Sequence, residues 1–124
     1  MELFLDPIAP AAGSARRALH SAAIFGAAAE PDALLLVSEL VTNSIVHAGH
    51  GGRDAIRVRA ASHGSMTRVE VCDRARGDTL PTMRPEPPPY ATGGRGLLLV
   101  DALSDRWGMD TCECGTCVWF ELAA

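Results

Sequence analysis

Apolar residues recur at intervals of three and four between residues 31 and 50, and this is the strongest helical pattern in the chain. Asp32 stands near its start and Gly49 near its end, so the stretch predicts one bounded amphipathic helix. Two polar residues, Glu39 and Asn43, lie four positions apart within the apolar run and should project from the same face of that helix. Because burying polar groups without partners is costly, we expect them either to serve a polar site or to be satisfied by neighbours.

An alanine-rich segment at residues 14–29 predicts a second helix, and the short apolar stretch 2–5 before it predicts an edge strand. Three basic residues of the segment, Arg16, Arg17 and His20, gather toward one side of the expected helix. Such a basic stripe is typical of a solvated helix face, and it also suits a docking surface for an acidic partner.

Beyond residue 52 the pattern changes from helical to alternating. Residues 56–60 and 67–71 alternate apolar and polar positions and are joined by a turn at 62–65, which predicts an antiparallel hairpin. Residues 106–111 and 117–122 predict a second, closing hairpin. The sheet is therefore expected to be built mainly from antiparallel neighbours.

The segment 79–92 is rich in proline and has neither helical nor strand periodicity, so it predicts a long connection. The glycine-rich run 93–96 follows it, and a helical pattern resumes over 97–103. Glycines directly ahead of a helix let backbone amides converge on a phosphate, although the same pattern occurs in plain loops.

The expected order is strand, helix, helix, two strands, long loop, helix and two strands. This order predicts an α+β fold, a two-layer sandwich with the helices on one face of a mixed, mainly antiparallel sheet. The doubly wound nucleotide-binding folds need regular β-α-β alternation, which is missing from this chain.

The composition sets bounds on the class of protein. The chain has 124 residues, of which 48% are hydrophobic and 21% charged, so it predicts one globular domain over residues 1–124. Its net charge of -4 argues against a nucleic-acid-binding surface. The N-terminal sequence lacks the features of a signal peptide and no apolar run is long enough to cross a bilayer, so we expect a cytoplasmic protein.

The four cysteines are Cys72, Cys112, Cys114 and Cys117. Without an export signal they are expected to be thiols rather than a disulfide framework. Cys112 and Cys117 could face each other across the closing hairpin, so an oxidation-dependent link between these two is the alternative.

Three sequence elements together carry a family resemblance: Glu39 with Asn43 in an apolar helix, Asp73 with Gly77 after a strand, and the run 93–97 before a helix. In this order they resemble the asparagine box and the two glycine boxes of the GHKL ATP-binding fold. That fold is shared by histidine kinases, DNA gyrase, heat-shock chaperones and mismatch-repair ATPases. Three boxes in sequence are a far more specific signal than any one of them.

Within this fold, the chain is most similar to the anti-sigma-factor serine kinases, a small stand-alone branch. The similarity covers residues 34–122 and is carried by SELVTNSIVHA, GGRGLLLVDALSDRWG and VWFEL. It implies a protein that binds ATP and Mg²⁺, phosphorylates a serine or threonine of an anti-sigma-factor antagonist, and in its other state sequesters a sigma factor. A homodimer is plausible for such a family, whereas direct contact with nucleic acid or membrane is not expected.

The resemblance also implies roles for individual residues. Asn43 would offer its amide oxygen to Mg²⁺, and Glu39 would act as the general base for the attacking hydroxyl. Asp73 would accept a hydrogen bond from the adenine amino group, which favours ATP over GTP. Gly77 would let the backbone pass close to the base.

The phosphates would be wrapped by the backbone amides of Gly94, Arg95, Gly96 and Leu97, with residues 79–94 as a lid over the nucleotide. The stripe formed by Arg16, Arg17 and His20 would contact the partner protein.

Three departures from the family pattern bear on activity. Ala75 stands where the first glycine of its box is expected, and the segment that would form the lid is short. Cys117 stands where relatives commonly have a threonine that assists adenine recognition, with Thr116 one place earlier. Thr116 is the candidate for this contact, but neighbouring strand residues face opposite sides, which leaves the substitution open. Two readings therefore stand: an active kinase, or a module that regulates a partner by binding alone.

Overall fold

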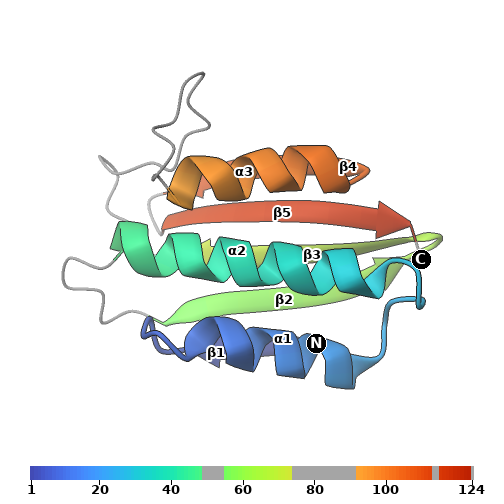
Figure 1. The fold of residues 1–124 in the computed structure, drawn as a ribbon, viewed down its shortest axis with the longest axis horizontal. Coiled ribbons are helices and arrows are strands. Elements are labelled where there is room, and N and C mark those ends of the chain that lie inside the picture. Colours follow the sequence, from blue (N-terminus) through green and yellow to red (C-terminus); the bar gives the residue numbers. More distant parts are fainter. Residues whose placement is uncertain (49–54, 74–91, 113–114, 124) are drawn as a thin grey trace.

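The computed structural model describes residues 1–48, 55–73, 92–112 and 115–123. In these ranges three helices pack on one face of a five-stranded sheet (Figure 1). The helices are α1 (Ala11–Ala22), α2 (Glu30–Ala48) and α3 (Thr92–Leu103). The strands are β1 (Glu2–Leu5), β2 (Ile56–His63), β3 (Met66–Asp73), β4 (Arg106–Cys112) and β5 (Gly115–Ala123). This arrangement confirms the predicted α+β sandwich.

The strand order in the sheet is β1-β2-β3-β5-β4, and every neighbouring pair is antiparallel. Both predicted hairpins are present, and each has longer strands than the alternation alone indicated. The β2–β3 hairpin closes through only Gly64 and Ser65, between the paired residues His63 and Met66. Gly64 has a φ of 63°, a left-handed conformation that glycine adopts without a steric penalty.

The prediction for the first helix was wrong at both ends, because the helix spans Ala11–Ala22 instead of residues 14–29. It ends at Ala23, whose φ of 53° is left-handed. Beyond this point Ile24 and Phe25 pack against the core, and the Ile24 carbonyl lies 3.5 Å from the Thr67 hydroxyl of β3. Tertiary packing therefore ends the helix although the following alanines favour its continuation.

The helix expected at 97–103 begins earlier, at Thr92. The run 93–96 was predicted to lie ahead of the helix, and that prediction was wrong because these residues form its first turn. A regular helix leaves the amides of its N-cap and of its first three residues without a partner inside the helix, so the amides of residues 92–94 are available for a ligand. Ala75, Gly77 and the segment 79–91 lie outside the described residues.

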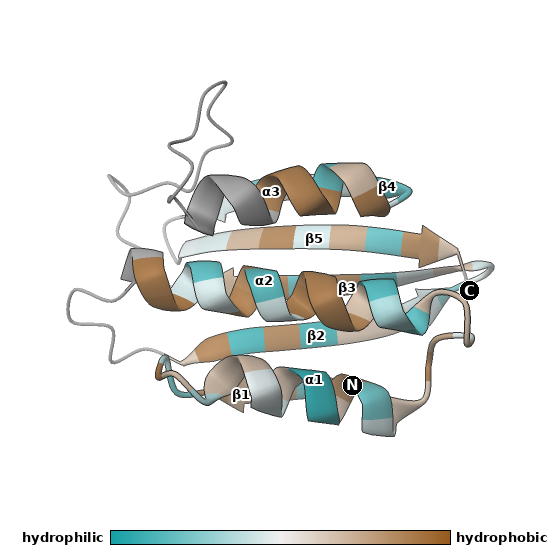
Figure 2. Ribbon diagram, in the orientation of Figure 1, coloured by the Kyte–Doolittle hydropathy of each residue, from teal (hydrophilic) through white to brown (hydrophobic). Residues whose placement is uncertain are grey.

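The hydrophobic core lies between the helices and the sheet. Its largest fully buried side chains include Phe120 of β5, Leu19 of α1, Leu36 of α2 and Ile56 of β2. Hydrophobic and hydrophilic residues alternate along the strands (Figure 2), as expected for a sheet with one covered face.

We call the helix-free side of the sheet the outer face. In register, its rows contain Phe4, Arg57, Cys72, Cys117 and Asp110, then Glu2, Arg59, Glu70, Trp119 and Gly108, then Ala61, Arg68, Glu121 and Arg106.

A disulfide joins Cys72 of β3 to Cys117 of β5. The expectation of free thiols was therefore wrong for these two residues, and the alternative partner Cys112 was wrong as well. Cys72 and Cys117 are directly opposite each other in the antiparallel ladder, where side chains of paired residues point to the same face. None of the helices in the described ranges is long and apolar enough to span a membrane.

Candidate functional site

A small cavity lies between α2, α3 and the sheet, with a volume of about 20 Å³. Its lining residues are Leu40, Asn43 and Ser44 of α2, Val71 and Asp73 of β3, Leu97 of α3 and Val118 of β5. Three of the residues that the sequence singled out, Asn43, Asp73 and Leu97, thus meet at one place although they are far apart in the chain. The cavity is the candidate functional site.

Helix α2 presents one side to α1 and another to the cavity. The Ser38 hydroxyl accepts a 2.6 Å hydrogen bond from the Arg16 guanidinium of α1, which fixes the side that faces α1. Asn43 is 6% exposed and shares the cavity with Leu97 of α3. Glu39 lies one turn before Asn43, so it projects on the same side, and it is half-buried.

The sheet contributes two cross-strand pairs to this side. Val71 is opposite Val118, and Asp73 is opposite Thr116. Because alternate residues share a face, Thr116 faces the cavity side together with Asp73, while Cys117 faces away. The sequence left open whether Thr116 could take the role of the threonine that relatives have at the position of Cys117. In the structure Thr116, and not Cys117, points toward the helices.

The hydroxyl group of Thr116 also points to a ligand. Its side chain is 2% exposed, and its hydroxyl oxygen has no hydrogen-bond partner in the part of the chain that the structure describes. A buried hydroxyl without a partner is unfavourable, and a bound ligand with a polar atom at this position would relieve the cost.

The chemistry of the cavity suits an adenine nucleotide with a divalent cation. Its apolar walls (Leu40, Val71, Leu97 and Val118) are of the kind that contact the faces of a flat ring. Asp73 supplies a hydrogen-bond acceptor, and the Asn43 side chain supplies an oxygen of the kind that Mg²⁺ binds. A volume of about 20 Å³ corresponds to one water molecule, so a purine would enter only if the walls move apart.

Comparison with known families decides what kind of domain this is. The family model described as the histidine kinase-like ATPase domain matches residues 5–122. The chain belongs to this family. The match confirms the resemblance to the GHKL ATP-binding fold and makes this ATPase domain a nucleotide-binding module.

Two solved structures have a similar fold. The crystal structure of the RsbU and RsbW domains of Rv1364c from Mycobacterium tuberculosis is 22% identical with a TM-score of 0.73, and the match covers 99% of this chain and 32% of that one. A blue-light activated histidine kinase of Erythrobacter litoralis, EL346, is 22% identical with a TM-score of 0.57, covering 90% of this chain and 40% of that one. The ATPase domain thus spans less than half of either neighbour. A search of curated proteins finds no match.

Four lining residues of the ATPase domain were not singled out from its sequence: Leu40, Ser44, Val71 and Val118. Signals for them existed. Ser44 directly follows Asn43 on the buried side of α2, and Val71 lies two residues before Asp73 on an alternating strand. Residues at i−2 on a strand and at i−3 on a helix share a face with a known site residue, as Val71 does with Asp73 and Leu40 with Asn43.

The other predicted site residues lie apart from the cavity or are described only in part. Gly94, Arg95 and Gly96 lie in the first turns of α3, and only their backbone is described. The stripe of Arg16, Arg17 and His20 is exposed on α1. Its members contact Ser38, Ser14 and Glu30, none of which lines the cavity.

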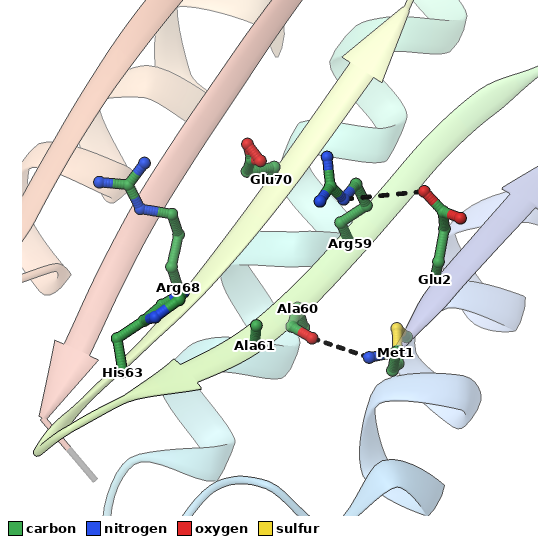
Figure 3. A pocket seen from close by; sticks show the side chains of 8 residues that line it. All are labelled: Met1, Glu2, Arg59, Ala60, Ala61, His63, Arg68 and Glu70. Carbon is green, nitrogen blue, oxygen red and sulfur yellow. Dashed lines mark hydrogen bonds and ion pairs between the residues drawn. The ribbon is translucent and has the colours of Figure 1, made fainter.

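A larger hollow of about 340 Å³ lies on the outer face of the sheet (Figure 3). Its floor contains Ala60 and Ala61, and charged side chains such as Arg59, Arg68 and Glu70 rim it. Arg59 pairs with Glu2 at 3.7 Å. This hollow contains none of the residues that the ATP-binding motifs indicate, so its size does not make it the nucleotide site.

Proposed function

We propose that this domain binds ATP with Mg²⁺ at the cavity between α2, α3 and β3, and that it transfers the γ-phosphoryl group to a serine or threonine of a partner protein. The observation that carries the proposal is the convergence of Asn43, Asp73 and Leu97 on one cavity, with Glu39 one helical turn away. Membership of the histidine kinase-like ATPase family supports the choice of nucleotide.

Asp73 and Thr116 are proposed to recognise adenine. The Asp73 carboxylate would accept a hydrogen bond from the exocyclic amino group, which guanine replaces with a carbonyl, so ATP is favoured over GTP. The Thr116 hydroxyl, buried and opposite Asp73, would pair with a ring nitrogen directly or through water. Gly77 would let the backbone approach the base.

Asn43 and the start of α3 are proposed to hold the triphosphate. Asn43 would hold Mg²⁺ through its amide oxygen, and the ion, when bound, would neutralise phosphate charge. The free amides in the first turn of α3, including that of Gly94, would bind phosphate oxygens with help from the helix dipole. The amides of Arg95, Gly96 and Leu97 lie deeper in the helix, so their binding to phosphate would require the first turn to unwind.

Glu39 is proposed to be the general base. It is half-buried, and no ion pair joins it to another described residue. A carboxylate so placed could accept the proton of an attacking hydroxyl while the γ-phosphoryl group leaves.

The proposed partner is an anti-sigma-factor antagonist, and in another state a sigma factor. The fold is similar to that of a structure containing an RsbW domain, and the sequence resembles anti-sigma-factor serine kinases. The exposed stripe of Arg16, Arg17 and His20 on α1 is the proposed contact surface, and a homodimer is part of the same proposal.

A second candidate function is a nucleotide-dependent binding module without phosphoryl transfer. The observation that favours it is Cys117, which takes the place of the family's threonine and faces the outer side in a disulfide. In this case adenine recognition rests on Asp73 and Thr116, without a threonine at position 117.

Phosphate transfer and nucleotide binding, measured separately, test the proposal. We expect Glu39→Gln to lower transfer from labelled ATP to a candidate antagonist by about 10²-fold or more while calorimetric nucleotide binding persists. Asp73→Asn should abolish binding, and Glu70→Gln on the outer face is the matched control. Equal transfer by Glu39→Gln and the native domain would overturn the assignment of the base, and transfer at background level by both would leave only the binding module.

A further inference from the structure

The disulfide lies next to the proposed adenine contacts in the β3–β5 ladder. The Cys72–Cys117 pair stands between Val71–Val118, which lines the cavity, and Asp73–Thr116. The sulfur atoms lie on the outer face, whereas both flanking pairs point to the inner one. Any change in the distance between the strands at the cysteines is thereby transmitted to both neighbouring pairs.

The disulfide lies near the end of the β3–β5 ladder, where a covalent link restrains the strands most. The β3–β5 pairing begins at Met66–Ala123 and ends at Asp73–Thr116. The last pair of a ladder opens more easily than interior pairs. A covalent bond one residue from that end restrains the opening, so it holds Asp73 and Thr116 at a fixed separation.

The surroundings of the two sulfur atoms differ. Cys72 is 9% exposed, and its sulfur lies 3.8 Å from the Arg57 guanidinium. Cys117 is only half-buried, on the face that no helix covers. An approaching thiolate therefore reaches the Cys117 sulfur more easily, and a cation beside Cys72 stabilises the thiolate that departs from it.

We propose that Cys72 and Cys117 form a thiol–disulfide modification site whose oxidised state gives the domain its high affinity for nucleotide. The inference rests on the proposed function, because it assigns the regulation of that same ATP site. The reductant is a dithiol, either a small molecule or a protein with two neighbouring cysteines.

The chemical step balances as an exchange. One thiolate of the dithiol attacks the Cys117 sulfur, a mixed disulfide forms, and Cys72 leaves as a thiolate beside Arg57. The second thiol of the reductant then displaces Cys117, so the reductant becomes a disulfide. Two electrons pass to the protein, and the two protons of the dithiol end on Cys72 and Cys117.

Reduction removes the restraint on the end of the ladder. The Asp73–Thr116 pair then spends more time apart, and nucleotide binding has to order it again at the expense of affinity. Thermodynamic linkage makes the effect reciprocal. If the disulfide raises the affinity for nucleotide by a given factor, bound nucleotide shifts the equilibrium of reduction toward the disulfide by the same factor.

The experiment compares nucleotide affinity in the two redox states. A Cys112→Ser/Cys114→Ser background leaves only the proposed pair, and mass analysis after alkylation counts the thiols. Calorimetric titration with ATP before and after treatment with dithiothreitol should give binding about fivefold weaker in the reduced form. Reoxidation should restore the affinity, and Cys72→Ser/Cys117→Ser should bind like the reduced form and ignore the reductant.

A second measurement needs no substitution. The equilibrium of the native disulfide with dithiothreitol, measured with and without saturating ATP, should shift by the same factor of about five. Equal affinity in both redox states, or no protection by ATP, would overturn the modification site and leave the ATP site intact. If neither the oxidised nor the reduced form binds ATP, the proposed function is overturned and this inference with it.

Discussion

The two faces of the sheet are built from the same strands and are held in different ways. On the inner face Val69 of β3 and Phe120 of β5 are opposite each other and fully buried beneath the helices. On the outer face their neighbours Glu70 and Trp119 are likewise opposite each other, yet only half-buried. One face excludes water by apolar packing, and the other covers itself with polar and aromatic side chains.

The outer face has its own organised cluster around Trp119. The Arg68 guanidinium lies 3.9 Å from the ring centroid and pairs with Glu121 at 3.0 Å. Arg106 approaches Glu121 at 3.5 Å from the other side. Gly108 of β4 lies beneath the ring, where an added Cβ would be 2.6 Å from the indole. A sheet face without helices can therefore be ordered by stacking and charge, and the contribution of each residue is expected to be smaller than in the core.

The sharpest test of the comparison replaces two adjacent residues of β5. Phe120→Ala should lower the free energy of unfolding by about 4 kcal/mol because it empties a fully buried site. Trp119→Ala should cost about 1 kcal/mol, since the ring is only half-buried and loses stacking more than burial. Urea unfolding measures both, and Phe120→Leu, expected near 1 kcal/mol, provides a milder variant that still folds. Similar losses for Phe120→Ala and Trp119→Ala would break the distinction between the faces.

The fit between Gly108 and Trp119 is the next test. Gly108→Val should destabilise the protein by about 2 kcal/mol, because the new side chain displaces the indole from its place on the strand. In a Trp119→Ala background the same substitution should have almost no effect. The double-mutant cycle isolates this coupling. An equal cost in both backgrounds would mean that backbone effects and not the ring govern the position.

The two arginines that share Glu121 should differ. Arg68 is 34% exposed at its side chain and Arg106 is 69% exposed, so solvent screens the second pair more strongly. Arg68→Ala should cost about 1.5 kcal/mol because it loses both the ring contact and the closer pair. Arg106→Ala should cost no more than about 0.5 kcal/mol. Thermal unfolding at low and high salt would show which substitution lowers stability more. A larger loss for Arg106→Ala than for Arg68→Ala would contradict the prediction.

At the cavity, one substitution is expected to raise stability slightly. Thr116→Val removes a buried hydroxyl that lacks a partner in the described part of the chain, so the free energy of unfolding should rise slightly, by up to about 1 kcal/mol. The same substitution should weaken ATP binding several-fold, because the proposed contact to adenine is lost. Unfolding and calorimetry on one variant would reveal this trade-off. Unchanged ATP affinity would remove Thr116 from the site.

Much of the fold and part of the site followed from local pattern. The period of α2, the alternation of β2 and β3 and the spacing between Glu39 and Asn43 are short-range features, and all of them indicated the observed elements. The helix α1 shows where such reasoning stops, because its end at Ala23 depends on Ile24 and Phe25 reaching the core. The early start of α3 at Thr92 was likewise missed, because glycine favours loops over helices when local propensity alone is considered.

By itself, therefore, the sequence determined the type of each element and identified each ATP-binding motif, because both depend on residues only a few positions apart. Tertiary structure decided three other things: that Asn43, Asp73 and Leu97 line one cavity, that Thr116 faces it, and that Cys72 pairs with Cys117 across 45 residues. The first depends on α2 packing against both β3 and α3, and the other two depend on β5 lying beside β3. Both arrangements join residues that are far apart in the chain, and they form as the inner face of the sheet is buried beneath the helices.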